Sequence, residues 1–170
     1  MFIGEGPGFH ENEQGRPFVG AAGKFLEELL AEIDMKRQQV FIANVVKCRP
    51  PGNRDPMPDE LQACGDYLER QIQAINPQVI VTLGRYSMAR FLPNARISDI
   101  HGQIFQIKGR TVVPMYHPAA ALHQPSLRNS VVADFAKLPG LIEKAMSSEA
   151  PIVEPEEKDD KQNPKQLSLF

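Results

Sequence analysis

The sequence lacks three features that would narrow its class at once: a set of cysteines, a long apolar run and an excess of charge of one sign. Its two cysteines exclude a disulfide scaffold and suit a reducing compartment. No segment is long and apolar enough to span a bilayer, and the amino terminus lacks the pattern of a signal peptide. The net charge of -2 gives no overall indication of nucleic acid. We therefore expect a cytoplasmic protein with no membrane partner.

The length and composition predict one domain with a tail. The chain has 170 residues, 42% of them hydrophobic, which is enough to bury one sizeable core. Residues 1–146 alternate between strand and helix patterns. Residues 147–165 are rich in charge and proline, which predicts a disordered linker. Residues 166–170 form a short terminal peptide that is again apolar.

Apolar periodicity predicts the elements of the domain. The predicted helices are 20–33, 58–75, 85–92 and 127–146, the last of them broken at Pro139–Gly140. The predicted strands are 40–46, 79–83, 103–107 and 111–116, of which the last two form a hairpin. Strands separated by helices favour an α/β fold, a three-layer α/β/α sandwich on a mostly parallel central sheet.

The most informative stretch is residues 4–20, GEGPGFHENEQGRPFVG. It joins a short apolar entry to a helix, and open α/β sheets bind their ligands at such strand ends. Its early glycines, among them Gly6, let the backbone approach a ligand closely. Most glycine-rich loops only turn the chain, and this one lacks the Lys and Ser/Thr of a phosphate-binding P-loop. Glu5, Glu11 and Phe18 in the same loop favour a site for a planar ligand.

Polar side chains follow two of the predicted strands. Asn44 interrupts the apolar strand 40–46, and two interpretations stay open: an amide that ties down a neighbouring loop, or one that reads a base. An amide pairs with O4 and N3–H of uracil, whereas cytosine presents the reverse pattern. His117 follows strand 111–116. A lone histidine there is usually a surface or capping residue, but at this sheet edge it is a candidate donor to a developing anion.

Basic residues gather in the loop 47–56, KCRPPGNRDP. Most such loops are only solvated, but Lys47, Arg49 and Arg54 suit phosphate contacts because prolines stiffen the segment beside the candidate site. Arg128 extends that surface. The two cysteines, Cys48 and Cys64, favour two unrelated free thiols when taken alone, since no CxxC pair and no pair of histidines completes a zinc site.

Four separated motifs resemble the type 4 uracil-DNA glycosylases, the iron-sulfur branch of that superfamily. They are GEGPGFHENEQGRPFVG, NVVKCRPPGNRDP, Ala63–Cys64 and YHPAAAL, and the resemblance covers about residues 1–146 in the same order. It implies a three-layer α/β/α domain that flips uracil out of DNA and hydrolyses the N-glycosidic bond. The resulting abasic site would start base excision repair.

The resemblance assigns two catalytic residues. Glu5 should stabilise the cationic sugar, position the attacking water, or both, and His117 should donate to O2 of the departing base. The implied substrate-binding residues are Gly6, Glu11, Phe18 and Asn44. Among them Phe18 should stack on uracil, Asn44 should read its N3 and O4 edge, and Glu11 should line the C5 side. The implied DNA-binding residues are Lys47, Arg49, Arg54, Leu122, His123 and Arg128. His123 stands where the family often has arginine, so this part of the DNA contact departs from the family.

The family binds a 4Fe-4S cluster through four cysteines, two of them in a CxxC pair before the first strand. Only Cys48 and Cys64 match as metal ligands, and two thiolates do not hold a four-iron cluster. The first strand would also be only about three residues long. We therefore expect the sequence to be an amino-terminal truncation. A monomer is the family expectation.

The last five residues, Gln166, Leu167, Ser168, Leu169 and Phe170, resemble the peptide by which bacterial repair proteins bind the sliding clamp. The resemblance predicts the clamp as a partner, and a flexible tether would raise the local concentration of the enzyme at DNA. A frayed apolar terminus is the alternative. Two other functions also stay open: a catalytically silent DNA-binding module recruited by the clamp, and a nucleotide-binding domain that uses the glycine loop for phosphates.

Overall fold

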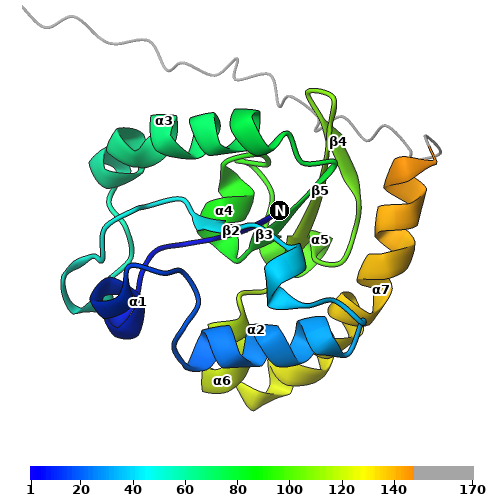
Figure 1. Ribbon diagram of the computed structural model, residues 1–170, viewed down its shortest axis with the longest axis horizontal. Coiled ribbons are helices and arrows are strands. Elements are labelled where there is room, and N and C mark those ends of the chain that lie inside the picture. The colour runs from blue at the N-terminus through cyan, green and yellow to red at the C-terminus, as the bar shows by residue number, and fades with distance from the viewer. Residues whose placement is uncertain (148–170) are drawn as a thin grey trace, which may run out of the picture.

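The computed structural model describes residues 1–147 (Figure 1). Five strands form one sheet in the order β2-β1-β3-β5-β4, and every neighbouring pair is parallel except β4 with β5. The strands are β1 (Phe2–Gly4), β2 (Ile42–Asn44), β3 (Val79–Leu83), β4 (Phe105–Ile107) and β5 (Arg110–Met115). The prediction of an α/β fold on a mostly parallel sheet is confirmed.

Helices cover both faces of this sheet. The α-helices are α1 (Phe9–Gln14), α2 (Ala21–Ala31), α3 (Pro58–Ile75), α4 (Arg85–Ala89), α5 (Ile97–Ile100), α6 (Pro118–His123) and α7 (Arg128–Met146). Three 3-10 turns connect them: η1 (Arg37–Gln39), η2 (Pro51–Asn53) and η3 (Pro125–Leu127). Figure 1 shows α3 and α2 on opposite sides of the sheet. The layers are therefore helix, sheet and helix.

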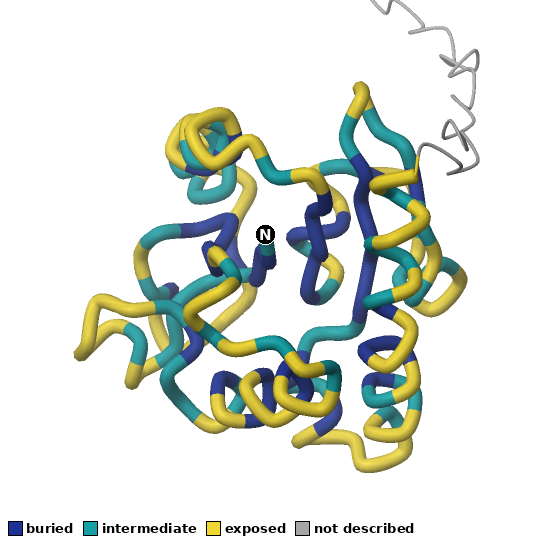
Figure 2. Tube along the Cα trace, turned by 45° about the vertical axis from the view of Figure 1, so that its right-hand side comes forward, coloured by how far each residue is buried: buried dark blue, intermediate teal, exposed yellow. Residues whose placement is uncertain are grey.

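Two apolar clusters fill the spaces between these layers. Successive side chains of a strand point to opposite faces, so in β1 Phe2 packs with α2 and α7 while Ile3 packs with α3. The ring of Phe2 stacks on that of Phe135 in α7 with 6.2 Å between centroids. Figure 2 shows the strands as buried and the outer turns of the helices as exposed. The core thus holds the strand ends, and the loops that follow them, in fixed positions.

The predicted break at Pro139–Gly140 is wrong, because α7 runs through both residues. Proline in a helix interior removes one backbone hydrogen bond and typically bends or ends the helix. Here Phe135 and Leu138, before the proline, and Leu141 and Ile142, after it, all pack on the same apolar cluster. Burial on both sides of Pro139 therefore outweighs the lost bond.

Several other features differ from the prediction. The strand predicted over 40–46 pairs only over β2, although the amides of Val45 and Val46 still donate to the carbonyls of Gly4 and Glu5 at 3.0 Å. The helix predicted over 85–92 ends at Ala89. The glycine loop 4–20 contains a helix of its own, α1, and α6 occupies the predicted loop after His117. The predicted hairpin is confirmed as β4 and β5.

No helix within residues 1–147 has the length and hydrophobicity needed to cross a membrane. The predicted linker, residues 147–165, lies outside the described residues except for Ser147, and the predicted clamp-binding peptide, residues 166–170, lies wholly outside them.

Candidate active site

The carboxyl ends of the parallel strands meet at one edge of the sheet. Gly4 of β1 pairs with Asn44 of β2, and Leu83 of β3 pairs with Met115 of β5. The loops that leave these strands begin with Glu5 and Gly84 and reach His117. The residues predicted from three separate parts of the sequence, the loop 4–20, Asn44 and His117, therefore lie at one edge, where open α/β sheets place their ligands.

Gly4 creates the space in which two side chains of the site meet. A Cβ atom added to Gly4 would lie 2.6 Å from Oδ1 of Asn44 and 2.6 Å from Cε2 of Phe18. Real Cβ atoms do not approach other heavy atoms so closely, so any larger residue here would displace the Asn44 amide and the Phe18 ring. The aromatic ring and the amide oxygen thus both lie where a side chain at this position would stand.

Asn44 is 6% exposed, and within the described part of the chain its Oδ1 is buried without a hydrogen-bond partner. A buried polar atom without a partner costs about 1–3 kcal/mol. The structure shows no loop that this oxygen ties down. The arrangement leaves a buried acceptor available for a ligand.

Phe18 and His117 form the aromatic part of the site. Their ring centroids are 5.4 Å apart and their planes are inclined by 28°. Phe18 is 5% exposed, and its backbone adopts a left-handed conformation with φ 54°, which few side chains adopt. The carbonyl side of this turn packs so closely on Gly23 of α2 that no side chain would fit at that glycine. The fold therefore specifies where the Phe18 ring lies.

His117 is held in one neutral tautomer. Its Nδ1 accepts a hydrogen bond from the amide of Ala119 at 3.1 Å, so the ring proton resides on Nε2. Burial lowers the pKa of His117 to about 4, and the negative charge of Glu11 only partly opposes this effect. Gly84, with φ 90°, lies against His117, because an added Cβ would be 3.1 Å from the Cβ of the histidine. The result is a neutral imidazole whose Nε2–H is a donor.

Glu11 closes the glycine loop onto α2. Its Oε1 accepts hydrogen bonds from the amides of Val19 at 2.8 Å and Gly20 at 2.7 Å. Burial alone would raise the pKa of Glu11, but hydrogen bonds from backbone amides, led by that of Gly20, outweigh it and lower the pKa. The carboxylate therefore stays ionised and fixes α1, in the middle of the loop, to the end of the loop.

Glu5 follows β1 and lies beside a charged pair. Burial is the main cause that raises the pKa of Glu5, Asp55 raises it further, and Arg85 opposes them. The guanidinium of Arg85 bonds the carboxylate of Asp55 and contacts the hydroxyl of Tyr86 at 3.1 Å. No role for Arg85 or Asp55 is predicted from the sequence. The position of Arg85 directly after Gly84, at the end of β3, is the signal that would have found it.

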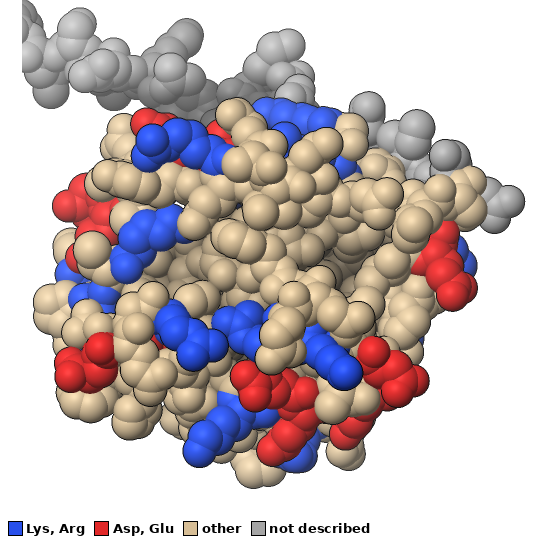
Figure 3. Space-filling view, viewed as in Figure 1, with Lys and Arg blue, Asp and Glu red and all other residues tan. Residues whose placement is uncertain are grey.

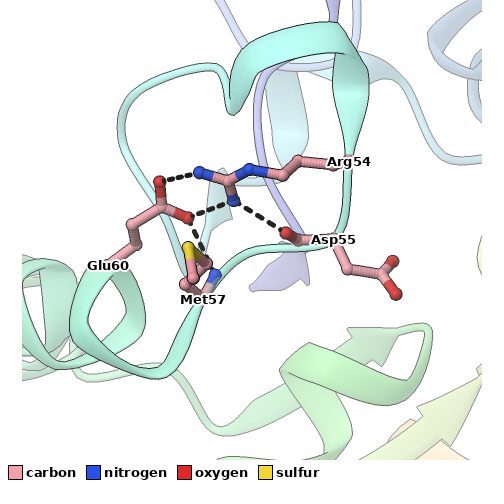
Figure 4. Close-up of polar contacts among 4 residues, drawn as sticks. All are labelled: Arg54, Asp55, Met57 and Glu60. Atoms are coloured by element: carbon pink, nitrogen blue, oxygen red, sulfur yellow. Dashed lines mark hydrogen bonds and ion pairs between the residues drawn. The ribbon is translucent and has the colours of Figure 1, made fainter.

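The cations predicted to contact phosphate have partners of their own. Nζ of Lys47 donates to the carbonyl of Asn44 at 2.8 Å and to Gln71 at 2.6 Å. Arg54 forms a two-pronged bond with Glu60 at 2.8 and 2.7 Å and also donates to the carbonyl of Asp55 (Figure 4). Figure 4 shows the carboxylate of Asp55 pointing away from this pair.

The other predicted DNA-binding residues lie on two further elements. Leu122 is 41% exposed and shares α6 with His123, which is exposed too. The guanidinium of Arg128, at the start of α7, lies 4.4 Å from the centroid of the Phe25 ring. Lys and Arg side chains on the face in Figure 3 are interspersed with Asp and Glu instead of forming one basic patch. These residues therefore stay predictions that rest on their position.

The two cysteines do not make a cluster site by themselves. Cys48 is exposed, and Sγ of Cys64 accepts a hydrogen bond from the amide of Lys47 at 3.3 Å. Residues 1–147 contain no group of three or more His, Cys, Asp or Glu side chains placed to hold a metal ion. Since a four-iron cluster needs four ligands, the donor set of this chain does not fit one.

Comparison with known proteins points to one family. The family model of the uracil DNA glycosylase superfamily matches residues 1–137. The chain is 49% identical over 148 residues to the type-4 uracil-DNA glycosylase of Archaeoglobus fulgidus, a match that covers 81% of this chain and 74% of that protein. It is 46% identical over 149 residues to the type-4 enzyme of Thermotoga maritima, with coverages of 85% and 78%. The type-5 uracil-DNA glycosylase of Thermus thermophilus is 31% identical over 138 residues, with coverages of 69% and 63%.

Proposed function

This chain belongs to the uracil DNA glycosylase superfamily, and we propose that it is a type-4 uracil-DNA glycosylase, which hydrolyses the N-glycosidic bond of uracil in DNA. One observation of the site carries the proposal: an amide oxygen that is buried and has no partner among residues 1–147 lies beside an aromatic ring, which in turn stacks on a neutral histidine. The product would be an abasic site, so the enzyme would begin base excision repair. A base can reach this recess only after it has left the helix stack.

Uracil recognition is assigned to Asn44 and Phe18. Oδ1 of Asn44 accepts from N3–H of uracil, and its amide nitrogen donates to O4. In cytosine, N3 is an acceptor and would face Oδ1 of Asn44, and the 4-amino group is a donor and would face the amide nitrogen. Neither group of Asn44 would then form a hydrogen bond. Phe18 provides the stacking surface. Gly6 and Glu11 complete the substrate-binding loop, in which Glu11 lines the C5 side where a thymine methyl would lie.

Bond cleavage is assigned to His117 and Glu5. As the bond breaks, the base gains negative charge and the sugar gains positive charge. The Nε2–H of His117 donates to O2 of the departing base, and a neutral donor keeps its proton throughout. The carboxylate of Glu5 stabilises the cationic sugar and orients the water that attacks C1′. Both groups thus act where charge develops, which is the condition for electrostatic catalysis.

Binding of the DNA strand is assigned to the loops around this recess. Lys47, Arg49 and Arg54 face the phosphates from one side, and Leu122, His123 and Arg128 approach from α6 and α7. In this proposal Arg54 exchanges Glu60 for phosphate when DNA binds, because an exposed ion pair costs little to break. The enzyme acts as a monomer in the cytoplasm.

We also propose that the chain binds the sliding clamp, whereas no step of the proposed reaction uses an iron-sulfur cluster. The peptide 166–170 would bind the bacterial sliding clamp, and the support for this is its sequence alone. Cys48 and Cys64 are the residues that match ligands of the iron-sulfur branch, and a cluster would need thiolates that this chain does not supply. None of the roles assigned to Asn44, Phe18, His117 or Glu5 depends on it.

The test is release of uracil from a single-stranded oligonucleotide, read as alkali-sensitive strand scission, with circular dichroism on the same sample. We expect scission by the unmodified chain and its loss in Glu5→Gln and His117→Ala. Glu28→Gln, which changes an exposed carboxylate on α2, serves as the control and should leave scission unchanged. A folded chain that binds uracil-containing DNA without releasing the base would contradict the proposal and favour a catalytically silent module.

A further inference from the structure

Phe9, the first residue of α1, is 54% exposed although it is a large apolar side chain. Its ring is not without contacts. The guanidinium of Arg49 lies 5.3 Å from the ring centroid, and His10 meets the ring edge-on with 5.4 Å between centroids. An exposed aromatic ring backed by a cation is a surface on which a nucleobase stacks well.

Phe9 and Arg49 connect the loop that follows β1, which carries Glu5, with the loop that follows β2, which comes directly after Asn44. Phe9 follows Glu5 in the loop after β1, and Arg49 follows Asn44 in the loop after β2. These loops run together, because a Cβ added to Gly6 would lie 2.6 Å from Val46 and 3.9 Å from Pro50. Figure 1 shows α1 beside the segment that contains η2. Phe9 and Arg49 therefore lie on the two loops that also carry Glu5 and Asn44, next to the site that would receive uracil.

Arg49 is fixed in this position. Its Nε donates to Oδ1 of Asn53 at 2.6 Å, and the buried Pro50 anchors the chain next to it. Gly52 and Asn53 adopt left-handed conformations that turn the loop back toward Arg49. A guanidinium held in this way loses little freedom when a ligand arrives.

We propose that Phe9 and Arg49 form a stacking site for the base of the nucleotide next to the flipped uridine. The inference rests on the proposed function and deepens it, since it identifies single-stranded DNA with an unpaired neighbouring base as the form that this stacking site accepts. The base stacks on the exposed Phe9 ring, and Arg49 supports the ring and contacts the phosphate between the two nucleotides. Stacking of this kind tolerates any base, because every base has a π face.

The experiment measures both binding and release with matched oligonucleotides. In one, 2-aminopurine occupies the position next to uracil, and its fluorescence reports stacking without any need for uracil release. In the other, the same position has sugar and phosphate but no base. We expect quenching with the unmodified chain and none with Phe9→Ala, together with roughly tenfold weaker binding of the base-bearing strand. The strand without the neighbouring base should bind Phe9→Ala and the unmodified chain equally.

Two further variants separate stacking from mere apolar contact. Phe9→Tyr should keep the quenching, whereas Phe9→Leu should lose it. Phe41→Ala is the matched control, because Phe41 is also an exposed phenylalanine, 39% exposed, but precedes β2 at the opposite end of the strand. Quenching that survives in Phe9→Ala, or equal loss of affinity for both strands, would overturn the proposal. Because quenching is read before any chemistry, its result stands even if no uracil is released, which would refute the proposed activity alone.

Discussion

The inner and outer parts of the candidate site differ in whether their polar groups already have partners. In the inner cluster, Phe18 and Asn44 are buried and His117 is half-buried, and the cluster holds an acceptor and a neutral imidazole donor. The outer loop, residues 47–57, is largely exposed, and two of its charges form ion pairs: Arg54 with Glu60, and Asp55 with Arg85.

This difference follows from what burial does to an unpaired group. An acceptor left without a partner in the interior costs about 1–3 kcal/mol, so the fold keeps it only where a ligand later supplies the missing bond. An exposed charge costs little whether or not it is paired, because water screens it. The inner cluster is therefore organised before the ligand arrives, and the outer loop has to exchange partners. Substitutions in the two regions should differ accordingly.

The largest expected effect is that of His117→Ala. Removing one donor aimed at a developing anion lowers kcat about 100-fold to 1,000-fold in comparable sites. Single-turnover uracil release with enzyme in excess measures this step directly. The affinity for uracil-containing DNA should change far less, because O2 accepts its full charge only as the bond breaks. A variant that loses binding and keeps the rate of release would show that His117 acts on the ground state.

Asn44→Ala should have the next largest effect. Two hydrogen bonds to uracil are lost, and at about 1.5 kcal/mol each this corresponds to roughly a 100-fold loss in kcat/KM. The free energy of unfolding should change by less than about 1 kcal/mol, since Oδ1 has no bond to lose within the described residues. Thr82→Val is the matched control, because Oγ1 of Thr82 is equally buried and without a partner there. A marked loss of stability in Asn44→Ala alone would support the structural reading of the amide.

The burial of His117 also predicts a pH dependence of stability. The pKa of His117 falls to about 4 in the folded chain from an ordinary value of 6.5. Between these two pH values the histidine is protonated in the unfolded chain but stays neutral in the folded chain. The contribution of neutral His117 to the free energy of unfolding is therefore fully present above pH 6.5 and is lost as the pH falls toward 4. The free energy of unfolding should fall by about 2 kcal/mol between pH 7 and pH 5. Urea unfolding of the unmodified chain and of His117→Gln measures it. Identical pH profiles of the two proteins would refute the prediction.

The sequence predicts the inner cluster better than the outer loop, for a physical reason. Asn44 and His117 stand out because a polar residue at the end of an apolar strand is visible in the sequence, and parallel strands bring such ends together. The partner of Arg54 depends on the path of a loop, which periodicity does not encode. The role of Arg85 depends on the same path, because Asp55 reaches it from thirty residues away.

Local rules failed where tertiary packing decides. Pro139 predicts a helix break, but the apolar residues on both sides of it bury against one cluster and keep α7 continuous. The left-handed backbone of Phe18 has no sequence signal either, since phenylalanine rarely adopts it. The left-handed conformation accompanies a tertiary contact, the close approach of the Phe18 carbonyl to Gly23. A contact of this kind is visible only in the folded chain.

A smaller effect tests the charges around Glu5. Arg85 lowers the pKa of Glu5 and Asp55 raises it, while burial is the main cause of its elevated value. The acid limb of the kcat/KM profile should therefore move to higher pH in Arg85→Gln and to lower pH in Asp55→Asn. Arg54→Gln is the control, because it removes the same charge from the neighbouring pair and should leave the limb in place. Shifts in the same direction in both variants would show that Glu5 does not set this limb.

The smallest effect is expected in the outer loop, where Glu60→Gln should strengthen DNA binding. Glu60 holds Arg54 with two hydrogen bonds and also accepts from the amide of Met57 at 2.8 Å (Figure 4). The amide of Gln keeps the Met57 contact but weakens the hold on Arg54, which then turns to phosphate. Affinity for single-stranded DNA should rise about twofold to threefold at low salt, and the slope of log K against log salt should steepen by up to about 0.7, the value of one phosphate contact. Glu28→Gln removes the same charge from α2 without touching Arg54. If both variants gain affinity equally, the gain comes from net charge, and the partner exchange proposed for the outer loop does not occur.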